Sequence, residues 1–243
     1  MKNIYGINPI SEILKITNDG VLFLIEGALN ARQKELETIA LSKEINIQYL
    51  NKDDFFKRFT NNDTQGVVFQ TNNDINFEIP ENQFYDELNK SLDNPVILIL
   101  DGIKDIGNLG GMIRTALLFD VKYIVIPKNN AATVNEVVIK RSAGAVFKLK
   151  IVYATNLNRV MEKLKKIHYW IYGADMSGVS IKNFSYAERT AIVMGDEGEG
   201  IRRLVKENCD EMIKIPSNEK LDSLNVSVSA GIILYDRYIK SFK

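Results

Sequence analysis

The sequence predicts an α/β fold made of a small N-terminal α/β domain and a C-terminal α/β domain built on a parallel sheet. Three observations lead to this prediction. Short Val/Ile/Leu-rich runs alternate with helical patterns along the 243 residues. The C-terminal runs are apolar throughout, which is typical of strands buried on both faces of a parallel sheet. A polar stretch rich in Asn, Asp and Glu, at about 71–93, separates the two parts.

Residues 1–75 form the predicted N-terminal domain. Three apolar runs predict strands at 21–27, 45–50 and 66–70, and helical patterns alternate with them at 8–16, 31–43 and 52–59. Residues 76–93 are a predicted linker, with a short helix at its end.

Residues 94–243 form the predicted C-terminal domain. Its apolar runs predict strands at 95–100, 123–127, 147–152, 169–174, 191–195 and 212–216. Ligands of such sheets bind outside the carboxyl ends of the strands, so the loops that follow the strands are the places to look for a site.

Composition excludes several function classes. The charges balance, with 31 Lys and Arg against 31 Asp and Glu, so overall electrostatics do not indicate a nucleic-acid partner. One cysteine, Cys209, and one histidine, His168, argue against an internal disulfide and against thiolate or histidine metal clusters, so we expect no metal. No segment approaches the roughly 18 apolar residues of a membrane span, and the start lacks the apolar stretch of a signal peptide. We therefore expect a cytoplasmic protein with no membrane partner.

The loop after the first C-terminal strand reads "LDGIKDIGNLGGMIRTALLFD", residues 100–120. Asn108 is expected to cap the helix that follows. Arg114 lies beside the buried stripe of that helix, where an arginine usually keeps its stem on apolar surface and its head in water. The glycines at 107, 110 and 111 favour the other interpretation, in which a ligand approaches the backbone closely.

The segment "AIVMGDEGEGI", residues 191–201, interleaves three glycines with Asp196, Glu197 and Glu199. The glycines are explained either by a tight connection from the strand to the next helix or by a ligand that approaches the backbone. If a ligand binds, the three carboxylates favour a neutral or cationic one. A Walker phosphate loop is excluded because no Lys-Ser/Thr ending follows, and no G-x-G-x-x-G follows any strand. A weaker signal is "YGADMSG" at 172–178, which is often only a turn.

The segment "IPSNEKLDSLNVSVSAGIILYD", residues 215–236, opens the last helix. Ser223 is expected to cap this helix. Small polar residues at 225, 227 and 229 then occupy its first two turns, which ordinary helices avoid because such side chains compete with the backbone for hydrogen bonds. A ligand or a tightly apposed chain segment is expected there.

These three segments resemble, in order and spacing, the signature motifs of the SpoU (TrmH-like) RNA ribose 2′-O-methyltransferases. The resemblance covers nearly the full length, including "YGINPISEIL" and "TQGVVFQ" near the start. It implies S-adenosylmethionine as cofactor, a trefoil knot at the C-terminal end of the sheet, a homodimer, and a guanosine ribose of large-subunit ribosomal RNA as the methyl acceptor. The sulfonium cation of S-adenosylmethionine suits the carboxylate-rich loop.

The resemblance also implies residue roles. Gly195, Ile215 and Leu224 would contact the cofactor through backbone atoms, with Met194, Gly173 and Ser223 as neighbours. Arg114 would act in catalysis by clamping a phosphate and polarising the ribose 2′ hydroxyl. Alternatively it would accept the proton of that hydroxyl, at greater cost because an arginine is rarely deprotonated. Asn108 would orient the substrate or Arg114, Glu197 would hold that arginine or a ribose hydroxyl, and Asn225 would line the pocket.

The candidate RNA contacts come from two sources. By resemblance they are Asn8, Arg32, Lys34 and Gln65 in the N-terminal domain. By charge they are Lys140 and Arg141, since residues 136–166 hold eight Lys and Arg against two Glu, a net charge of +6. A solvated helix face would explain the same charges.

Two questions stay open at this level. The last helix, with Ile232, Ile233, Tyr235 and Tyr238, either contacts a second subunit or packs on its own sheet. The chain could also methylate transfer RNA or a small molecule, or bind RNA without catalysis.

Overall fold

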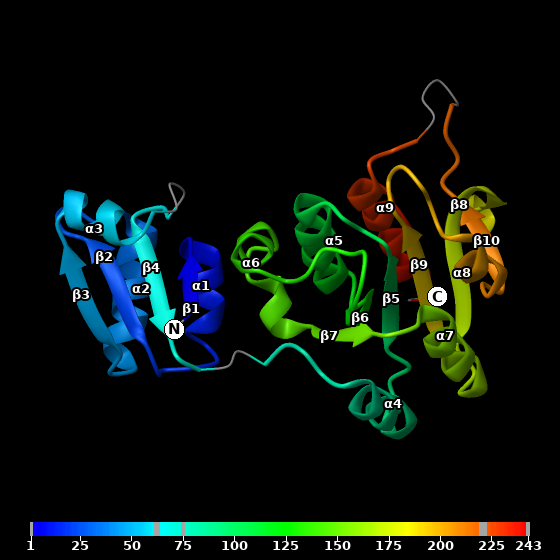
Figure 1. Ribbon diagram of the computed structural model, residues 1–243, viewed down its shortest axis with the longest axis horizontal. Coiled ribbons are helices and arrows are strands. Elements are labelled where there is room, and N and C mark those ends of the chain that lie inside the picture. Colours follow the sequence, from blue (N-terminus) through cyan, green and yellow to red (C-terminus); the bar gives the residue numbers. More distant parts are fainter. Residues whose placement is uncertain (1, 61–63, 74–75, 219–222, 242–243) are drawn as a thin grey trace. The chain divides into compact units, whose positions relative to one another are not determined.

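The computed structural model describes residues 2–60, 64–73, 76–218 and 223–241, and the chain divides into two compact units (Figure 1). The first unit comprises Met1–Asn76 and Val134–Phe147, and the second comprises Phe77–Thr133 and Lys148–Lys243.

The first unit contains a four-stranded sheet in the order β1-β4-β2-β3. Strands β2 (Val21–Ile25), β3 (Asn46–Leu50) and β4 (Val67–Thr71) confirm the predicted strands, whereas β1 (Lys2–Tyr5) was not predicted. The sequence does not reveal β1 because this four-residue strand pairs only with β4, which lies more than sixty residues away. Helices α1 (Ile7–Ile13), α2 (Ala31–Ser42) and α3 (Lys52–Arg58) follow the predicted helical patterns, and α6 (Glu136–Arg141) also belongs to this unit.

Local caps and an aromatic cluster stabilise the first unit. Asn30 and Gln33 form a capping box at the start of α2, each side chain bonding the other residue's backbone N–H. Phe59 packs edge to face with Phe23 and with Phe55, at centroid distances of 5.2 Å in both pairs. This cluster forms the core between α3 and the sheet.

The second unit contains a six-stranded sheet in the order β10-β8-β9-β5-β6-β7, and every pairing in it is parallel, as predicted. The central strands β5 (Val96–Asp101) and β9 (Thr190–Gly195) are buried along their whole length. The predicted strand at 147–152 begins later, because 145–148 form a short 3-10 helix. The other strands are β6 (Val121–Pro127), β7 (Lys150–Ala154), β8 (Trp170–Ser180) and β10 (Glu211–Lys214).

Helices cover the parallel sheet. These are α4 (Glu81–Lys90), α5 (Ile106–Leu118), α7 (Leu157–Lys166), α8 (Arg203–Glu207) and α9 (Val226–Lys240). The predicted short helix before the domain is α4, and its Phe84 and Leu88 are buried in the core of the second unit. Residues from Phe77 onward form part of this unit, because Phe77 and Ile79 share backbone hydrogen bonds with Ile151 of β7 and the apolar face of α4 packs in the core.

Two predicted helix caps were wrong. Asp105, not Asn108, caps α5, since its side chain accepts a hydrogen bond from the Asn108 N–H at 2.6 Å. Asn225, not Ser223, caps α9 by accepting from the Ser227 N–H. Helix α5 thus begins three residues earlier than predicted, which frees the Asn108 side chain for other contacts.

The small residues of α5 and α9 let these two helices pack closely. A Cβ added to Gly111 would lie 3.3 Å from the Ser227 Cβ, and one added to Gly231 would lie 3.4 Å from the Thr115 Cγ2. The serines of α9 were expected to meet a ligand or an apposed segment, and Ser227 meets a segment. Strand order alone does not define a knot, so the trefoil knot stays a prediction from the family resemblance. Among the described residues, no helix is both long and apolar enough to cross a lipid bilayer.

Candidate active site

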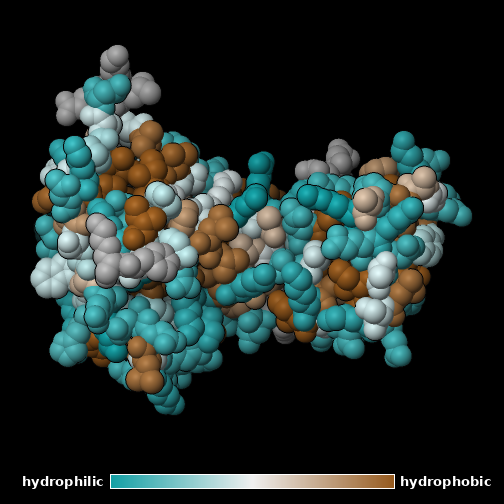
Figure 2. Space-filling view, turned by 180° about the vertical axis from the view of Figure 1, so that it is seen from behind, coloured by the Kyte–Doolittle hydropathy of each residue, from teal (hydrophilic) through white to brown (hydrophobic). Residues whose placement is uncertain are grey.

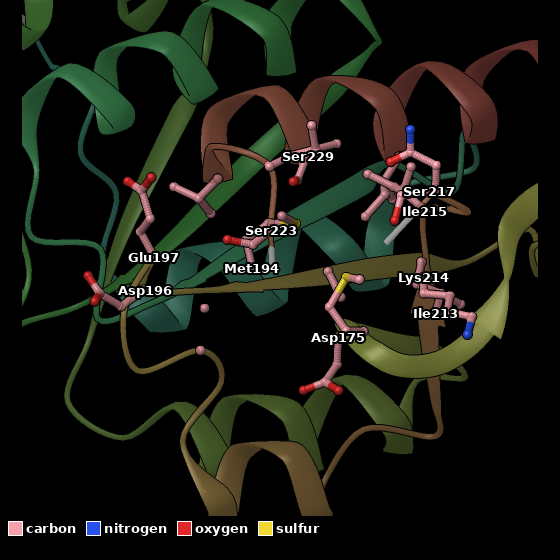
Figure 3. Close-up of a pocket in the computed structure, with 18 residues that line it drawn as sticks. Asp175, Met194, Asp196, Glu197, Ile213, Lys214, Ile215, Ser217, Ser223 and Ser229 are labelled. Carbon is pink, nitrogen blue, oxygen red and sulfur yellow. The ribbon is translucent and has the colours of Figure 1, made fainter. Parts of the chain in front are cut away.

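A cavity of about 550 Å³ lies in the second unit at the carboxyl ends of β9 and β10, beside residues 174–176 in the middle of β8 and the start of α9 (Figure 3). Parallel neighbours end at the same edge of the sheet, so segments far apart in the sequence meet there. The cavity is lined by Ala174, Asp175, Met176, Met194, Gly195, Asp196, Glu197, Gly200, Ile213, Lys214, Ile215, Ser217, Asn218, Ser223, Leu224, Val226, Ser229 and Ile233.

Five of the six predicted cofactor residues line this cavity, namely Met194, Gly195, Ile215, Ser223 and Leu224. The sixth, Gly173, does not. A Cβ on Gly173 would lie 2.6 Å from the Met212 Cε and 2.9 Å from the Cys209 Sγ. Gly173 therefore serves the close packing of β8 against its neighbours rather than the cavity wall.

The loop after β9 is a tight hairpin over residues 196–200. Asp196 and Gly200 exchange two backbone hydrogen bonds, of 3.2 and 2.9 Å. Gly200 has φ +67, a left-handed conformation that favours glycine. A Cβ on Gly195 would lie 2.1 Å from the Gly200 carbonyl carbon, so only glycine lets the hairpin fold back on the end of β9. Two of the three glycines are thus required by the loop itself.

Hydrogen bonds join residues from all three motif segments at the edge of the cavity. The Asn108 Nδ2 donates to the Glu197 Oε2 at 3.0 Å, and the Asn225 Nδ2 donates to the Asn108 Oδ1 at 2.9 Å. We call the chain Glu197–Asn108–Asn225 the rim network. Three of the four predicted catalytic residues are therefore linked through Asn108, although they are up to 117 positions apart. Asn225 was expected to line the pocket, but of these three residues only Glu197 does so.

The fourth predicted catalytic residue, Arg114, is exposed on α5 and does not line the cavity. Within the part of the chain that the structure describes, its guanidinium makes no hydrogen bond or ion pair. The proposed contact between Glu197 and this arginine is replaced by the bond from Asn108.

The cavity wall carries more negative than positive charge. Asp175, Asp196 and Glu197 contribute carboxylates, and Lys214 contributes the one ammonium among the described lining residues. Figure 3 shows Asp196 and Glu197 at one end of the cavity and Ile215 and Ser217 at the other. A cationic ligand is favoured by such a wall.

Asp175 is a lining residue that sequence reasoning did not single out. Partial burial works to raise its pKa, but hydrogen bonds from Lys206 at 2.7 Å and from Ser177 outweigh it and hold the pKa of this carboxyl below its usual value. Its only signal in the sequence was its place in the weak "YGADMSG" segment after a strand.

The predicted RNA contacts lie on the first unit. Asn8, Arg32, Lys34 and Arg141 have exposed side chains, and Lys140 is partly buried in the last turn of α6. Gln65 has a structural role as well: its Oε1 accepts the Ile7 N–H at 2.9 Å at the start of α1, where Gly6 offers no side-chain cap.

Comparison with known proteins gives a consistent result. The family described as "SpoU rRNA Methylase family" matches residues 95–235, and "RNA 2′-O ribose methyltransferase substrate binding" matches residues 3–74. The chain is 34% identical to "23S rRNA (guanosine-2′-O-)-methyltransferase RlmB" of Neisseria meningitidis, over 95% of this chain and 92% of the relative. The protein of the same name from Escherichia coli K12 is also 34% identical, over 96% of each chain.

A solved structure agrees in fold. The SpoU methyltransferase AviRb from Streptomyces viridochromogenes, in complex with the cofactor AdoMet, aligns with a TM-score of 0.74 at 19% identity, over 99% of this chain and 90% of that chain. The α/β class predicted for the chain is confirmed by the two sheets and by this likeness. With a family match over more than half of its length and relatives of 34% identity, the chain belongs to the SpoU rRNA methylase family.

Proposed function

We propose that the protein transfers a methyl group from S-adenosylmethionine to the ribose 2′ oxygen of a guanosine in 23S ribosomal RNA. We also propose that it acts in the cytoplasm. The relatives' names support this substrate. The observation that carries the proposal is the rim network, which brings the three motif segments together beside one cavity.

The cavity fits the cofactor in size and chemistry. Its volume of about 550 Å³ lies in the range of small-molecule sites. Short side chains at Ser217, Ser223 and Ser229 leave room for a ligand held by main-chain groups. When bound, S-adenosylmethionine supplies a methyl group on a cationic sulfonium, and the surplus of carboxylates in the wall favours that charge.

The rim network would hold the acceptor ribose. Because the Asn108 amide is bonded at both ends, its orientation is set by Glu197 on one side and Asn225 on the other. Glu197 Oε2 is engaged by Asn108, and Oε1 remains to accept a hydrogen bond from a ribose hydroxyl. Fixing the hydroxyl beside the methyl donor supplies the alignment on which a displacement reaction depends.

Arg114 would act on the RNA rather than on the cofactor. A guanidinium stays protonated in proteins and presents a fork of donors that matches a phosphate. An exposed arginine without a protein partner among the described residues suits this role. We propose that Arg114 clamps the phosphate next to the acceptor ribose and polarises its hydroxyl.

The N-terminal part would recruit the RNA. We propose that residues 1–75 act as the substrate-binding domain, and that the catalytic domain predicted at 94–243 extends back over most of the predicted linker at 76–93, because α4 packs in its core. Asn8, Arg32, Lys34 and Gln65, with Lys140 and Arg141, are the proposed contacts. The match of residues 3–74 to a substrate-binding family supports the first assignment.

We also propose that the protein is a homodimer that pairs through the outer face of α9. Apolar residues recur there at i, i+4, i+7 and i+11: Val228, Ile232, Tyr235 and Ile239 are 50%, 36%, 51% and 42% exposed. Of the predicted contact residues, Ile233 instead faces its own core. The space-filling view shows apolar patches on the face of the second unit that it presents (Figure 2).

Light scattering tests the dimer. Tyr235→Glu places a charge in the α9 stripe and should yield a monomer, whereas Leu41→Glu, at a residue of α2 in the first unit that is 64% exposed, should leave the mass unchanged. An unchanged mass for Tyr235→Glu would contradict the proposed interface.

Methyl incorporation tests the activity. Ribose methylation should be mapped by mass spectrometry in 23S ribosomal RNA from cells with and without the protein, and purified protein should be tested on ribosomal and transfer RNA. Arg114→Ala should abolish transfer while calorimetry shows unchanged cofactor binding, and the exposed Arg203→Ala should retain activity. Methylation of transfer RNA alone would favour that substrate, and RNA binding without cofactor uptake would leave only a non-catalytic binding protein.

A further inference from the structure

Asp101, the last residue of β5, holds a carboxylate that is wholly inaccessible to solvent and is clamped by one residue. Its Oδ2 accepts the backbone N–H of Arg202 at 2.8 Å, and its Oδ1 accepts the Arg202 Nε at 2.7 Å and contacts Nη2 at 2.6 Å. We call this arrangement the Asp101–Arg202 clamp. Three donors from one residue thus converge on a single buried carboxylate.

A buried carboxylate is costly unless it is fully paired, and charge-assisted hydrogen bonds are the strong ones. Here the guanidinium engages Oδ1 and the backbone N–H engages Oδ2, so both oxygens are paired. The clamp therefore constrains Arg202 more than an ordinary surface ion pair would. The nearby Lys104–Glu199 pair joins the same two loops at 3.2 Å, but its side chains are 58% and 69% exposed. Exposed pairs contribute about 0–1 kcal/mol and cannot hold the loops alone.

The clamp lies where the methyl-transfer machinery begins. In the sheet register, Asp101 is directly opposite Gly195, the residue that precedes the 196–200 hairpin. Arg202 follows the same hairpin. One residue of β5 thus ties down both ends of the segment that places Asp196 and Glu197 in the cavity wall.

Asp101 also starts the other side of the site. The chain runs from Asp101 directly into the loop that leads to α5 and Asn108. The hydrogen bond between Asn108 and Glu197 joins two segments separated by 89 positions, and both segments start from Asp101 or its pairing partner. A shift of the hairpin at Arg202 would therefore move Glu197 relative to Asn108.

We propose that Asp101 and Arg202 are positioning residues for methyl transfer: the clamp sets the register of the hairpin, and through it the cofactor cavity and the rim network. This inference rests on the proposed function. Neither residue lines the cavity, so both act through the hairpin.

Arg202→Met tests the clamp, because it removes the guanidinium but keeps the backbone N–H. The expected result is cofactor binding weakened about tenfold or more, with kcat lowered by a similar factor and KM for RNA within about twofold of wild type. Arg202→Lys keeps the positive charge but loses the planar set of guanidinium donors. Its cofactor affinity and kcat should lie between those of wild type and those of Arg202→Met. Hydrogen exchange of the apo protein should speed up at the amides of residues 196–200.

Two control variants separate positioning from other effects. Lys165→Met breaks a similar pair, in which Asp210 binds Lys165 at 2.9 Å and the Ile171 N–H at 2.8 Å, away from the hairpin. It controls for lost stability, measured by thermal unfolding. Arg203→Met removes the neighbouring exposed charge, 77% exposed, and controls for lost attraction to RNA. Neither should change cofactor affinity or hairpin exchange.

A double variant tests whether Arg202 affects methyl transfer through the hairpin and Glu197. If Arg202 acts through the hairpin, Arg202→Met combined with Glu197→Gln should lose less kcat than the product of the two single losses. Wild-type cofactor affinity and kcat for Arg202→Met would overturn the proposal, even if its unfolding temperature fell. Absence of methyl transfer in the wild type would refute the proposed function instead, and cofactor binding and hairpin exchange would still decide the role of the clamp.

Discussion

Gly195→Ala is the sharpest test of how the cavity is built. The added Cβ would lie 2.1 Å from the Gly200 carbonyl carbon and 2.2 Å from the Ile201 nitrogen. Non-bonded carbons normally lie about 3.5–4.0 Å apart, so the hairpin would have to move by roughly 1.5 Å. The obstructing atoms are backbone, which cannot rotate away as the end of a side chain can.

The expected losses of stability and of cofactor affinity follow from this displacement. Overpacking of this kind typically costs about 1–3 kcal/mol, and each 1 kcal/mol lowers the unfolding temperature by about 2–4 °C in a chain of this size. Gly195, Asp196, Glu197 and Gly200 all line the cavity and would shift together. We therefore expect S-adenosylmethionine to bind at least about tenfold more weakly, which corresponds to roughly 1.4 kcal/mol.

Gly198→Ala is the matched control in the same hairpin. A Cβ there would meet only the Asp196 Oδ1, at 3.7 Å, an ordinary contact. Calorimetric titration with S-adenosylmethionine and thermal unfolding should place Gly198→Ala close to wild type and Gly195→Ala well below it. Equal affinities for the two variants would refute the argument that the hairpin's fold on β9 shapes the cavity.

Three further predictions concern single side chains. Asn108→Ala removes both hydrogen bonds of the rim network and should lower kcat roughly tenfold to a hundredfold with cofactor affinity retained, as single-turnover kinetics would show. Burial works to raise the pKa of Glu87, but hydrogen bonds from Lys150 and Tyr123 outweigh it and lower that pKa below 4.5. The ionised carboxylate therefore contributes fully to the free energy of unfolding above pH 4.5, and this contribution is lost as the pH falls through the lowered pKa. Glu87→Gln should accordingly be less stable than wild type at neutral pH, with the difference shrinking in urea titrations at lower pH. Burial raises the pKa of the Cys209 thiol to about 12, so thiol reagents should modify it slowly in the native protein and quickly in denaturant.

Short-range patterns in the sequence were enough for most elements of the fold. Continuous apolar runs predicted the strands of the parallel sheet, because strands buried on both faces need apolar residues at every position. The same reasoning missed β1, whose pairing with β4 is a long-range contact. Asn108 and Ser223 were misplaced as caps because several residues near each helix start could cap it, and only the backbone path selects Asp105 and Asn225.

The motif segments indicated which residues belong to the site, and the sequence alone determined this much: a carboxylate-rich, glycine-rich loop, an arginine-bearing helix and a helix start rich in small polar residues. The tertiary structure decided how they meet. Asn108 bonds Glu197 and Asn225, Gly173 packs between strands, Gly195 accommodates the hairpin, and Asp101 anchors it. The hydrogen bonds of Asn108 to Glu197 and Asn225, and of Asp101 to Arg202, join residues 89 to 117 positions apart. They depend on strand order and register, which no local periodicity encodes.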